Sequence, residues 1–278
     1  MITYKCCADV DKEVVFHAFC DGFSDYIIKL ETTESPFFER FFGAEGNSLE
    51  HSFIAIEEGR GVGLILGGIR DFDGIRTMRC GTMCVSPLHR KKGIAAQLLK
   101  LHKNIAIEKE CKQLFLEVIT SNDVAISFYE ANGYFKVYDI AYYSTEKVDF
   151  FYGERTELIE EISIEELRLF RNAFCELHIN WQNEIDYITQ TQAKIFGFKD
   201  SNKLVGAISI NKGAIQFLGV GKEYRRKGIA KALIKKCVDM KESKIRVSFS
   251  NNSSLELYLR KMKFTREPIA QYEMYCNL

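Results

Sequence analysis

The chain repeats one pattern at residues 88–100, LHRKKGIAAQLLK, and at residues 223–235, EYRRKGIAKALIK. Five residues of the first stretch recur 135 positions later: Arg90, Lys92, Gly93, Ile94 and Ala95. A second similar pair follows, NDVAISFYEANGY at 122–134 and NSSLELYLRKMKF at 252–264, with an offset of 130. Two motifs repeated in the same order indicate two copies of one domain in tandem, and a length of 278 residues allows two domains.

The elements around these motifs follow the same order in both halves. In the first half, strand patterns at 51–58, 61–69 and 75–85 precede the glycine loop, and an amphipathic helix pattern follows it from about Lys92 to Lys109. A strand at 114–119, a helix at 123–132 and a strand at 134–144 complete the half. This order predicts an α/β (α+β) fold in which each copy is a mixed sheet with helices on both faces. We expect domains at 1–145 and 156–278, joined by the segment 144–155.

Composition narrows the class of protein. Hydrophobic residues make up 46% and charged residues 27% of the chain, which is typical of a folded globular protein. The 38 basic residues cancel the 38 acidic ones, so the total charge does not favour a nucleic acid or a membrane as partner. No C-x-x-C pair or histidine spacing matches a metal site, so we expect reduced thiols and no metal. The start of the sequence, MITYKCCADV, has no signal-peptide pattern, and we expect a cytoplasmic protein.

The glycine loop has the features of an anion site. In each copy a strand leads directly into Arg-x-x-Gly-Ile-Ala, which opens a helix. The first turn of a helix has unpaired backbone N–H groups and the positive end of the helix dipole, so a small residue there lets a phosphate approach. The loop lacks the P-loop lysine pattern and the second glycine of the dinucleotide fingerprint. The alternative is a basic turn whose glycine serves packing alone.

Taken together, VSPLHRKKGIA, Asn122 and the FYEANGY stretch resemble the GCN5-related N-acetyltransferase (GNAT) superfamily, whose coenzyme motif is Arg/Gln-x-x-Gly-x-Gly/Ala. The resemblance covers the order of elements in both halves. It implies a splayed mixed sheet in each copy, acetyl-coenzyme A as co-substrate and no metal.

The resemblance also implies a set of coenzyme contacts. The pyrophosphate would lie on backbone amides from Arg90 to Ala95, and the pantetheine arm would pair with the strand that ends at Cys84 and Val85. Asn122 would hydrogen-bond either the pantetheine or the local backbone. For Lys91, a solvated basic face is the alternative to a phosphate contact. The expected coenzyme-binding residues are Cys84, Val85, Arg90, Lys91, Lys92, Gly93, Ile94, Ala95 and Asn122.

Two residues match catalytic positions of the family. Tyr129 is at the position whose hydroxyl protonates the coenzyme sulfur, and Glu117 matches a glutamate used as a base by ribosomal-protein N-terminal acetyltransferases. The alternatives are a tyrosine at an amphipathic boundary and a strand-end carboxylate that faces solvent or pairs with a lysine. Acidic residues in the segment 23–42, Asp25 among them, are candidates to attract a cationic amine, although exposed loop carboxylates are common.

The second copy lacks these two groups. At the offset of 130, Leu259 is opposite Tyr129 and Val247 is opposite Glu117, whereas a slip of one residue would bring Tyr258 to the tyrosine position. We expect this copy to be catalytically weak or silent. It would act as a wall of the substrate cleft, as the second half of an internal pseudo-dimer, or as an accessory coenzyme site.

The resemblance therefore implies an N-acetyltransferase that moves an acetyl group from acetyl-coenzyme A to a primary amine of a small molecule or a peptide N-terminus. The alternative function is an acyl-coenzyme A sensor or regulatory module that transfers nothing. The sequence does not identify the amine, and beyond the internal pseudo-dimer it does not predict an oligomeric state.

Overall fold

The computed structural model describes residues 1–29, 31–147, 157–174 and 177–278. The chain forms two compact units, residues 1–137 together with 272–278, and residues 138–271. Most of the expected connection at 144–155 falls outside the described residues. Within the described part of the chain, no helix is long and apolar enough to cross a membrane.

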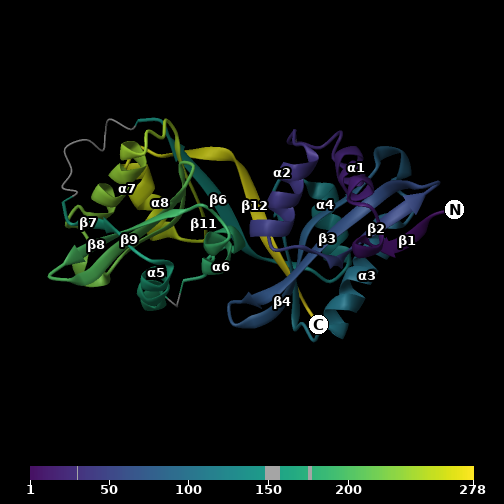
Figure 1. The fold of residues 1–278 in the computed structure, drawn as a ribbon, viewed down its shortest axis with the longest axis horizontal. Coiled ribbons are helices and arrows are strands. Elements are labelled where there is room, and N and C mark those ends of the chain that lie inside the picture. Colours follow the sequence, from purple (N-terminus) through teal and green to yellow (C-terminus); the bar gives the residue numbers. More distant parts are fainter. Residues whose placement is uncertain (30, 148–156, 175–176) are drawn as a thin grey trace. The chain divides into compact units, whose positions relative to one another are not determined.

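The first unit consists of a mixed sheet with helices on both faces (Figure 1). Its strands follow the order β1-β2-β3-β4-β5-β12, where β12 is the last strand of the chain (Thr265–Asn277). Every assigned pair is antiparallel except β4 with β5, which is parallel. The elements of this unit are β1 (Thr3–Cys6), η1 (Cys7–Asp9), α1 (Lys12–Gly22), α2 (Glu34–Glu39), η2 (Arg40–Ala44), β2 (Ser48–Glu57), β3 (Arg60–Phe72), β4 (Ile75–Val85), η3 (Pro87–His89), α3 (Ile94–Glu108), β5 (Gln113–Ile119) and α4 (Asp123–Ala131).

The second unit repeats this arrangement in the order β12-β6-β11-β10-β9-β8-β7, with β10 and β11 parallel. The predicted fold class, two mixed-sheet domains in tandem, is therefore confirmed. Its elements are β6 (Phe135–Thr145), β7 (Ile159–Glu161), α5 (Ile164–Arg171), η5 (Asn172–Phe174), η6 (Trp181–Asn183), α6 (Ile185–Thr189), β8 (Lys194–Asp200), β9 (Lys203–Asn211), β10 (Ala214–Val220), η7 (Lys222–Tyr224), α7 (Ile229–Asp239), β11 (Ile245–Ser250), α8 (Ser253–Lys261) and β12 (Thr265–Asn277).

The last strand of each repeat completes the sheet of the other repeat. Strand β6 pairs with β11 from Ile140 opposite Ser250 to Thr145 opposite Ile245. The end of β12 belongs to the first unit, where Met274 and Cys276 join the core. The units defined by packing thus differ from the expected ranges 1–145 and 156–278. The local sequence pattern predicts that each of these strands forms. It does not predict which sheet the strand joins, because the last strand of either copy can pair with the same open edge.

A close approach between helix and strand recurs in both units and positions the glycine loops. A Cβ atom on Gly63 of β3 would lie 2.7 Å from Ile94 Cγ2, and one on Gly206 of β9 would lie 2.7 Å from Ile229 Cγ2. Ile94 and Ile229 are the first residues of α3 and α7, and both are buried. Glycine at these two strand positions therefore lets each loop-bearing helix start directly against the sheet.

The sheet of each unit opens between its two parallel strands. Strands β4 and β5 pair from Thr77 to Cys80, and β10 and β11 pair only at Ala214 and Ile215. Beyond these points the strands of each pair no longer bond to each other, although β4 stays paired with β3 as far as Val85. The mixed sheet that the sequence predicts is present in both copies, with the splay that the family resemblance implies.

His102 links the stability of the first unit to pH. The side chain is fully buried in α3, and neither ring nitrogen has a hydrogen-bond partner in the described part of the chain. Burial, followed by the neighbouring His51, lowers the pKa of His102 to about 3. An unfolded chain would protonate this imidazole near pH 6.5, so it binds more protons than the folded protein between the two pKa values.

We therefore expect the free energy of unfolding to fall as pH drops below about 6.5, by about 2 kcal/mol from this residue between pH 7.5 and pH 5. Urea unfolding at the two pH values measures the difference, and His102→Leu should remove this part of it. His17→Gln, at an exposed histidine, is the control. An unchanged pH dependence in His102→Leu would contradict the assignment.

Candidate active site

The two glycine loops have the same backbone conformation. After β4 and η3, Lys91 and Gly93 have positive φ values of 61° and 79°, and after β10 and η7, Arg226 and Gly228 have values of 66° and 83°. No neighbouring atom lies within 4 Å of the position that a Cβ on Gly93 would take. Glycine is therefore favoured here by the left-handed backbone conformation, and not by lack of space. Such alternating backbone turns several N–H groups toward one point and creates an anion-binding concavity.

The start of α3 leaves backbone donors available to a ligand. Gly93 is the N-cap residue and supplies no side-chain acceptor for the first-turn N–H groups, and Gly228 does the same for α7. Lys91, Lys92 and Gly93 are exposed, while the Ile94 side chain is buried in the core. Ile94 can therefore contribute only its backbone, whereas both lysines can meet a phosphate.

Arg90 ties the loop to the preceding strand. Its Nε donates to the Val85 carbonyl at 3.1 Å, and its terminal nitrogens donate to the two Asp25 oxygens at 2.7 and 2.6 Å. The hydrogen bond from Arg90 lowers the pKa of Asp25. Arg225 repeats the backbone contact, because its Nε donates to the Val220 carbonyl at 3.2 Å. The repeated arginine thus has a structural partner in both copies, and in the first copy it engages the carboxylate that the sequence offered for a cationic amine.

Cys84 and Val85 are the last two residues of β4, ahead of the glycine loop. The Cys84 side chain is 6% exposed, its thiol donates to the Ala18 carbonyl at 3.6 Å, and a Cβ on Gly22 would lie 2.4 Å from its sulfur. Burial raises the pKa of this thiol. Cys84 therefore packs on the α1 side of the sheet, and its backbone, not its sulfur, lies at the splay.

The two asparagines cap helices. Asn122 Oδ1 accepts from the Ala125 N–H at 3.2 Å, and Asn252 Oδ1 accepts from the Leu255 N–H at 3.0 Å. Of the two roles expected for Asn122, the local backbone contact is the one the structure contains. Because α4 and α8 both start directly after these caps, the offset of 130 holds along the helices and Leu259 occupies the position of Tyr129.

Tyr129 lies beside the point where β4 and β5 separate. The side chain is 7% exposed, and its ring centroid is 5.5 Å from that of Tyr134. Burial is the largest cause that raises the pKa of the phenol well above its ordinary value, and the thiol of Cys80 is the next. Cys80 is the last residue of β4 that pairs with β5. The raised pKa keeps the Tyr129 phenol protonated at neutral pH.

Glu117 is part of a buried cluster of charged side chains on the other face of the sheet. Arg79 Nη2 donates to Glu117 Oε2 at 2.6 Å, and Arg79 Nη1 donates to Glu45 Oε2 at 2.7 Å. All three side chains are at most 6% exposed. Burial opposes the charge of Arg79, but Glu117 and Glu45 outweigh it and raise the pKa of the guanidinium. Glu117 thus lies in the protein interior and pairs with a buried arginine.

Sequence reasoning missed Arg79 and Glu45. The one available signal was for Arg79, a charged residue at an interior position of the strand pattern IRTMRCGTMCV at 75–85. The structure also corrects one correspondence between the two copies, that of Val247 with Glu117. Leu116 and Val247 both face the α3 and α7 side of their sheets, so Ser248, not Val247, occupies the face of Glu117. The correspondence shifts by one because the second copy has one residue fewer between this strand position and the capping asparagine.

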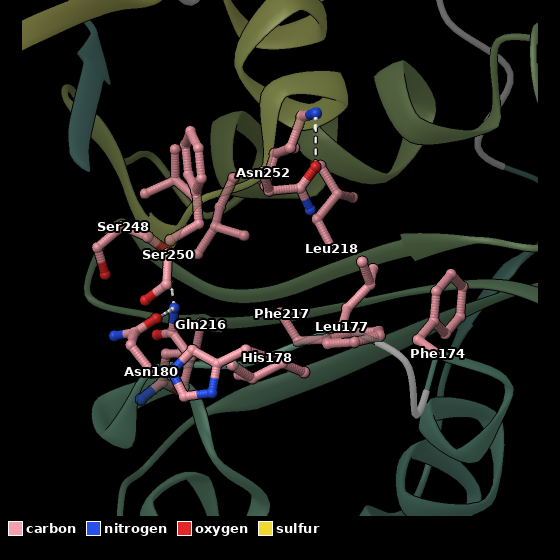
Figure 2. A pocket seen from close by; sticks show the side chains of 16 residues that line it. Phe174, Leu177, His178, Asn180, Gln216, Phe217, Leu218, Ser248, Ser250 and Asn252 are labelled. Atoms are coloured by element: carbon pink, nitrogen blue, oxygen red, sulfur yellow. Dashed lines mark hydrogen bonds between the residues drawn. The ribbon is translucent and has the colours of Figure 1, made fainter. Parts of the chain in front are cut away.

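The second unit contains a half-open pocket in its own splay (Figure 2). It lies between β10 and β11 and is covered by the segment around η6. Its described lining carries amides, hydroxyls, apolar side chains and the imidazole of His178. The lining residues are Phe174, Leu177, His178, Ile179, Asn180, Asn183, Ile215, Gln216, Phe217, Leu218, Val247, Ser248, Phe249, Ser250, Asn252 and Leu255. Within the described residues, no three His, Cys, Asp or Glu side chains come together as a metal-binding group.

Removing Arg79 should destabilise the first unit. In Arg79→Met, two buried carboxylates lose their shared cation, and we expect the free energy of unfolding to fall by about 3 kcal/mol or more. Urea unfolding measures this change. Arg76→Met, at an exposed arginine three residues earlier, is the control and should change the value by less than about 0.5 kcal/mol. Equal stability of the two variants would show that the ion pairs are not holding this cluster.

Comparisons with known proteins give one family for both halves. A sequence model described as "Acetyltransferase (GNAT) family" matches residues 15–134, and one described as "Acetyltransferase (GNAT) domain" matches residues 158–262. No curated protein matches the chain.

Several solved structures share the fold over the whole chain. A tandem GNAT protein from the clavulanic acid biosynthesis pathway has a TM-score of 0.71 at 14% identity and covers 100% of this chain and 98% of that chain. A GCN5-related N-acetyltransferase from Sphaerobacter thermophilus has a TM-score of 0.65 at 15% identity, covering 100% and 95%. A putative acetyltransferase from Pyrococcus horikoshii has a TM-score of 0.67 at 15% identity, covering 100% and 89%.

Proposed function

Because the chain belongs to the acetyltransferase (GNAT) family, with two of its domains in tandem, we propose that its first unit is an acetyl-coenzyme A dependent N-acetyltransferase. The acceptor is a primary amine of a small molecule or a peptide N-terminus. The observation that carries the proposal is the position of the Tyr129 phenol, protonated and buried beside Cys80, where the parallel strands part.

Acyl transfer from a thioester to an amine has two proton requirements. The departing thiolate gains a proton, and the attacking amine must lose one, since it is largely ammonium at neutral pH. Tyr129 is the proposed donor of the first proton, because its phenol lies beside Cys80, where the parallel strands part. Glu117 is the proposed acceptor of the second proton, and Arg79 holds its carboxylate in one orientation on β5.

The proposed coenzyme site uses backbone more than side chains. N–H groups of Gly93, Ile94 and Ala95 would meet the pyrophosphate, and the exposed Lys91 and Lys92 would add charge near it. Arg90 supports the loop through Val85 and Asp25. The backbone groups of Cys84 and Val85 on the edge of β4 away from β3 would face the pantetheine arm. The Asn122 cap fixes the start of α4 beside it.

Tyr129→Phe should lower kcat by roughly 10²- to 10⁴-fold, the range for a positioned acid or base, and leave the Kd for coenzyme A nearly unchanged. Release of free thiol from acetyl-coenzyme A over a panel of amines measures turnover. Tyr134→Phe removes a hydroxyl from an equally buried neighbour and should retain full turnover. Wild-type kcat in Tyr129→Phe would remove Tyr129 from the mechanism.

The two loops can be separated by matched glycine substitutions. Gly93→Ala and Gly228→Ala each place a Cβ on a residue with left-handed φ, which costs about 1–2 kcal/mol and distorts the N–H groups. We expect Gly93→Ala to weaken coenzyme A binding by about tenfold or more and to reduce turnover, while Gly228→Ala keeps turnover. Titration calorimetry gives affinity and stoichiometry. Loss of turnover in Gly228→Ala alone would place the chemistry in the second unit.

A second candidate function has support from the second unit. Its loop repeats the conformation of the first, but Leu259 and Ser248 replace the two proposed catalytic groups. This unit would then bind acyl-coenzyme A without transferring the acyl group. Two coenzyme molecules per chain in the titration of the wild type, and one in Gly228→Ala, would favour this function for the second unit.

A further inference from the structure

The turn that follows α1, residues 22–26, lies against the glycine loop of the first unit; we refer to it as the α1 turn. Its first residue, Gly22, ends α1 and lies close to β4, because a Cβ atom there would be 2.4 Å from Cys84 Sγ. The chain then turns back, and the Tyr26 N–H donates to the Phe23 carbonyl at 3.1 Å. The α1 turn therefore starts from a position that close packing on the sheet fixes.

Asp25 of the α1 turn binds the guanidinium of Arg90. Its two oxygens accept from the two terminal nitrogens of Arg90 at 2.7 and 2.6 Å, and one of these nitrogens also donates to the Gly22 carbonyl at 3.5 Å. Such a paired arrangement suits a phosphate as well as a carboxylate. The Arg90 Nε bonds elsewhere, to the Val85 carbonyl at 3.1 Å. Anchoring of the loop to β4 thus uses Nε, and the terminal nitrogens are the part of Arg90 that can exchange its partner.

Tyr26 brings the α1 turn to the other parallel strand. Burial raises the pKa of its phenol, and a hydrogen bond with the side chain of Asn122, at the cap of α4, acts in the opposite direction. Tyr26 is also among the groups that raise the pKa of Tyr129. Arg90 follows β4 and Asn122 follows β5, so the α1 turn spans both strands beyond the point at which they part.

The contacts that hold the α1 turn in place are weak ones. The side chains of Arg90 and Asp25 are 44% and 50% exposed, and an ion pair so open to solvent contributes little to stability. Directly after Tyr26, the side chains of Ile27 and Ile28 are 59% and 37% exposed, so they add little packing. A segment with few buried contacts opens locally at low cost while the rest of the fold stays intact.

A coenzyme on the loop would compete with Asp25 for Arg90. This step rests on the proposed function, in which backbone N–H groups from Gly93 to Ala95 meet the pyrophosphate. Arg90 is three residues before Gly93, so the pyrophosphate would bring several negative charges close to a carboxylate of the same sign. The phosphates would repel Asp25 and offer the terminal nitrogens of Arg90 an acceptor of the same paired geometry.

We infer that the α1 turn is a latch in which Asp25 acts as an internal anion that competes with the coenzyme for Arg90. Without coenzyme, Asp25 occupies the terminal nitrogens and Tyr26 covers the opening on the α1 face. Bound coenzyme takes over these nitrogens while Nε keeps its bond to Val85, and the α1 turn is released. Because such coupling is reciprocal, loss of the latch strengthens coenzyme binding.

The experiment uses the full chain and coenzyme A as the probe, at 0.15 M salt. Asp25→Asn removes the competing charge at constant size and should lower the Kd for coenzyme A about two- to fivefold, as measured by titration calorimetry. Glu31→Gln removes the same charge from an exposed position in the same segment and is the matched control. Its Kd should stay within about 1.5-fold of the wild-type value, because salt screens exposed charges that make no direct contact.

Hydrogen exchange with mass spectrometry follows the α1 turn directly, through a peptide that contains residues 22–28. Saturating coenzyme A should speed exchange there by about threefold or more in the wild type and slow it at the start of α3. In Asp25→Asn the α1 turn should exchange fast without coenzyme, whereas Glu31→Gln should behave like the wild type. Thermal unfolding of each variant establishes that it folds.

Three outcomes would overturn the latch: slower exchange of the α1 turn with coenzyme A, an unchanged or higher Kd in Asp25→Asn, or an equal change of Kd in both variants. None of these measurements needs acyl transfer. A chain that shows the latch but releases no thiol from acetyl-coenzyme A would contradict the proposed function alone, and transfer with an unchanged Kd in Asp25→Asn would contradict the latch alone. Failure of coenzyme A to bind the wild type and Asp25→Asn would contradict both.

Discussion

Each sheet contains two parallel strands that separate after a few residues, and the rest of both sites depends on this separation. Backbone N–H and C=O groups that lose a neighbouring strand must find other partners. In the second unit a side chain supplies one, since the Asn183 amide donates to the Ser248 carbonyl. In the first unit β4 remains paired with β3 as far as Val85, so its other edge is directed into the opening. An extended ligand can complete such an edge.

The two copies share the loop and differ in how they fill the opening. Both loops place glycine at a left-handed N-cap and tie an arginine to the carbonyl five residues earlier. The first copy adds a buried phenol on one face and a charged cluster around Arg79 on the other. The second copy has leucine and serine at the corresponding positions. The scaffold for binding is therefore duplicated, while the groups suited to proton transfer are present once among the described residues.

The described residues around these two openings differ in buried charge. Arg79 is stable in the first unit because two carboxylates approach it within 2.7 Å, and a lone charge at that depth would be costly. The amides and hydroxyls of the second unit need no such balance, since they bond to one another and to backbone.

The sequence alone determined the features that depend on neighbouring residues. The repeat predicted two domains, the strand and helix patterns predicted a mixed sheet, and Gly93 and Gly228 marked the loops correctly, because left-handed backbone favours glycine wherever it occurs. The capping role of Asn122 was one of two stated alternatives for the same local reason.

Tertiary structure alone decided the contacts between distant segments. The exchange of β6 and β12 depends on which open edge a strand meets, and the pairing of Arg90 with Asp25 joins residues 65 positions apart. Arg79 reaches Glu45 and Glu117 from a third segment, and Ser248 takes the face of Glu117 because one residue is missing before the cap. Burial, charge pairing and strand register arise from packing in three dimensions, and the order of residues along the chain does not record them.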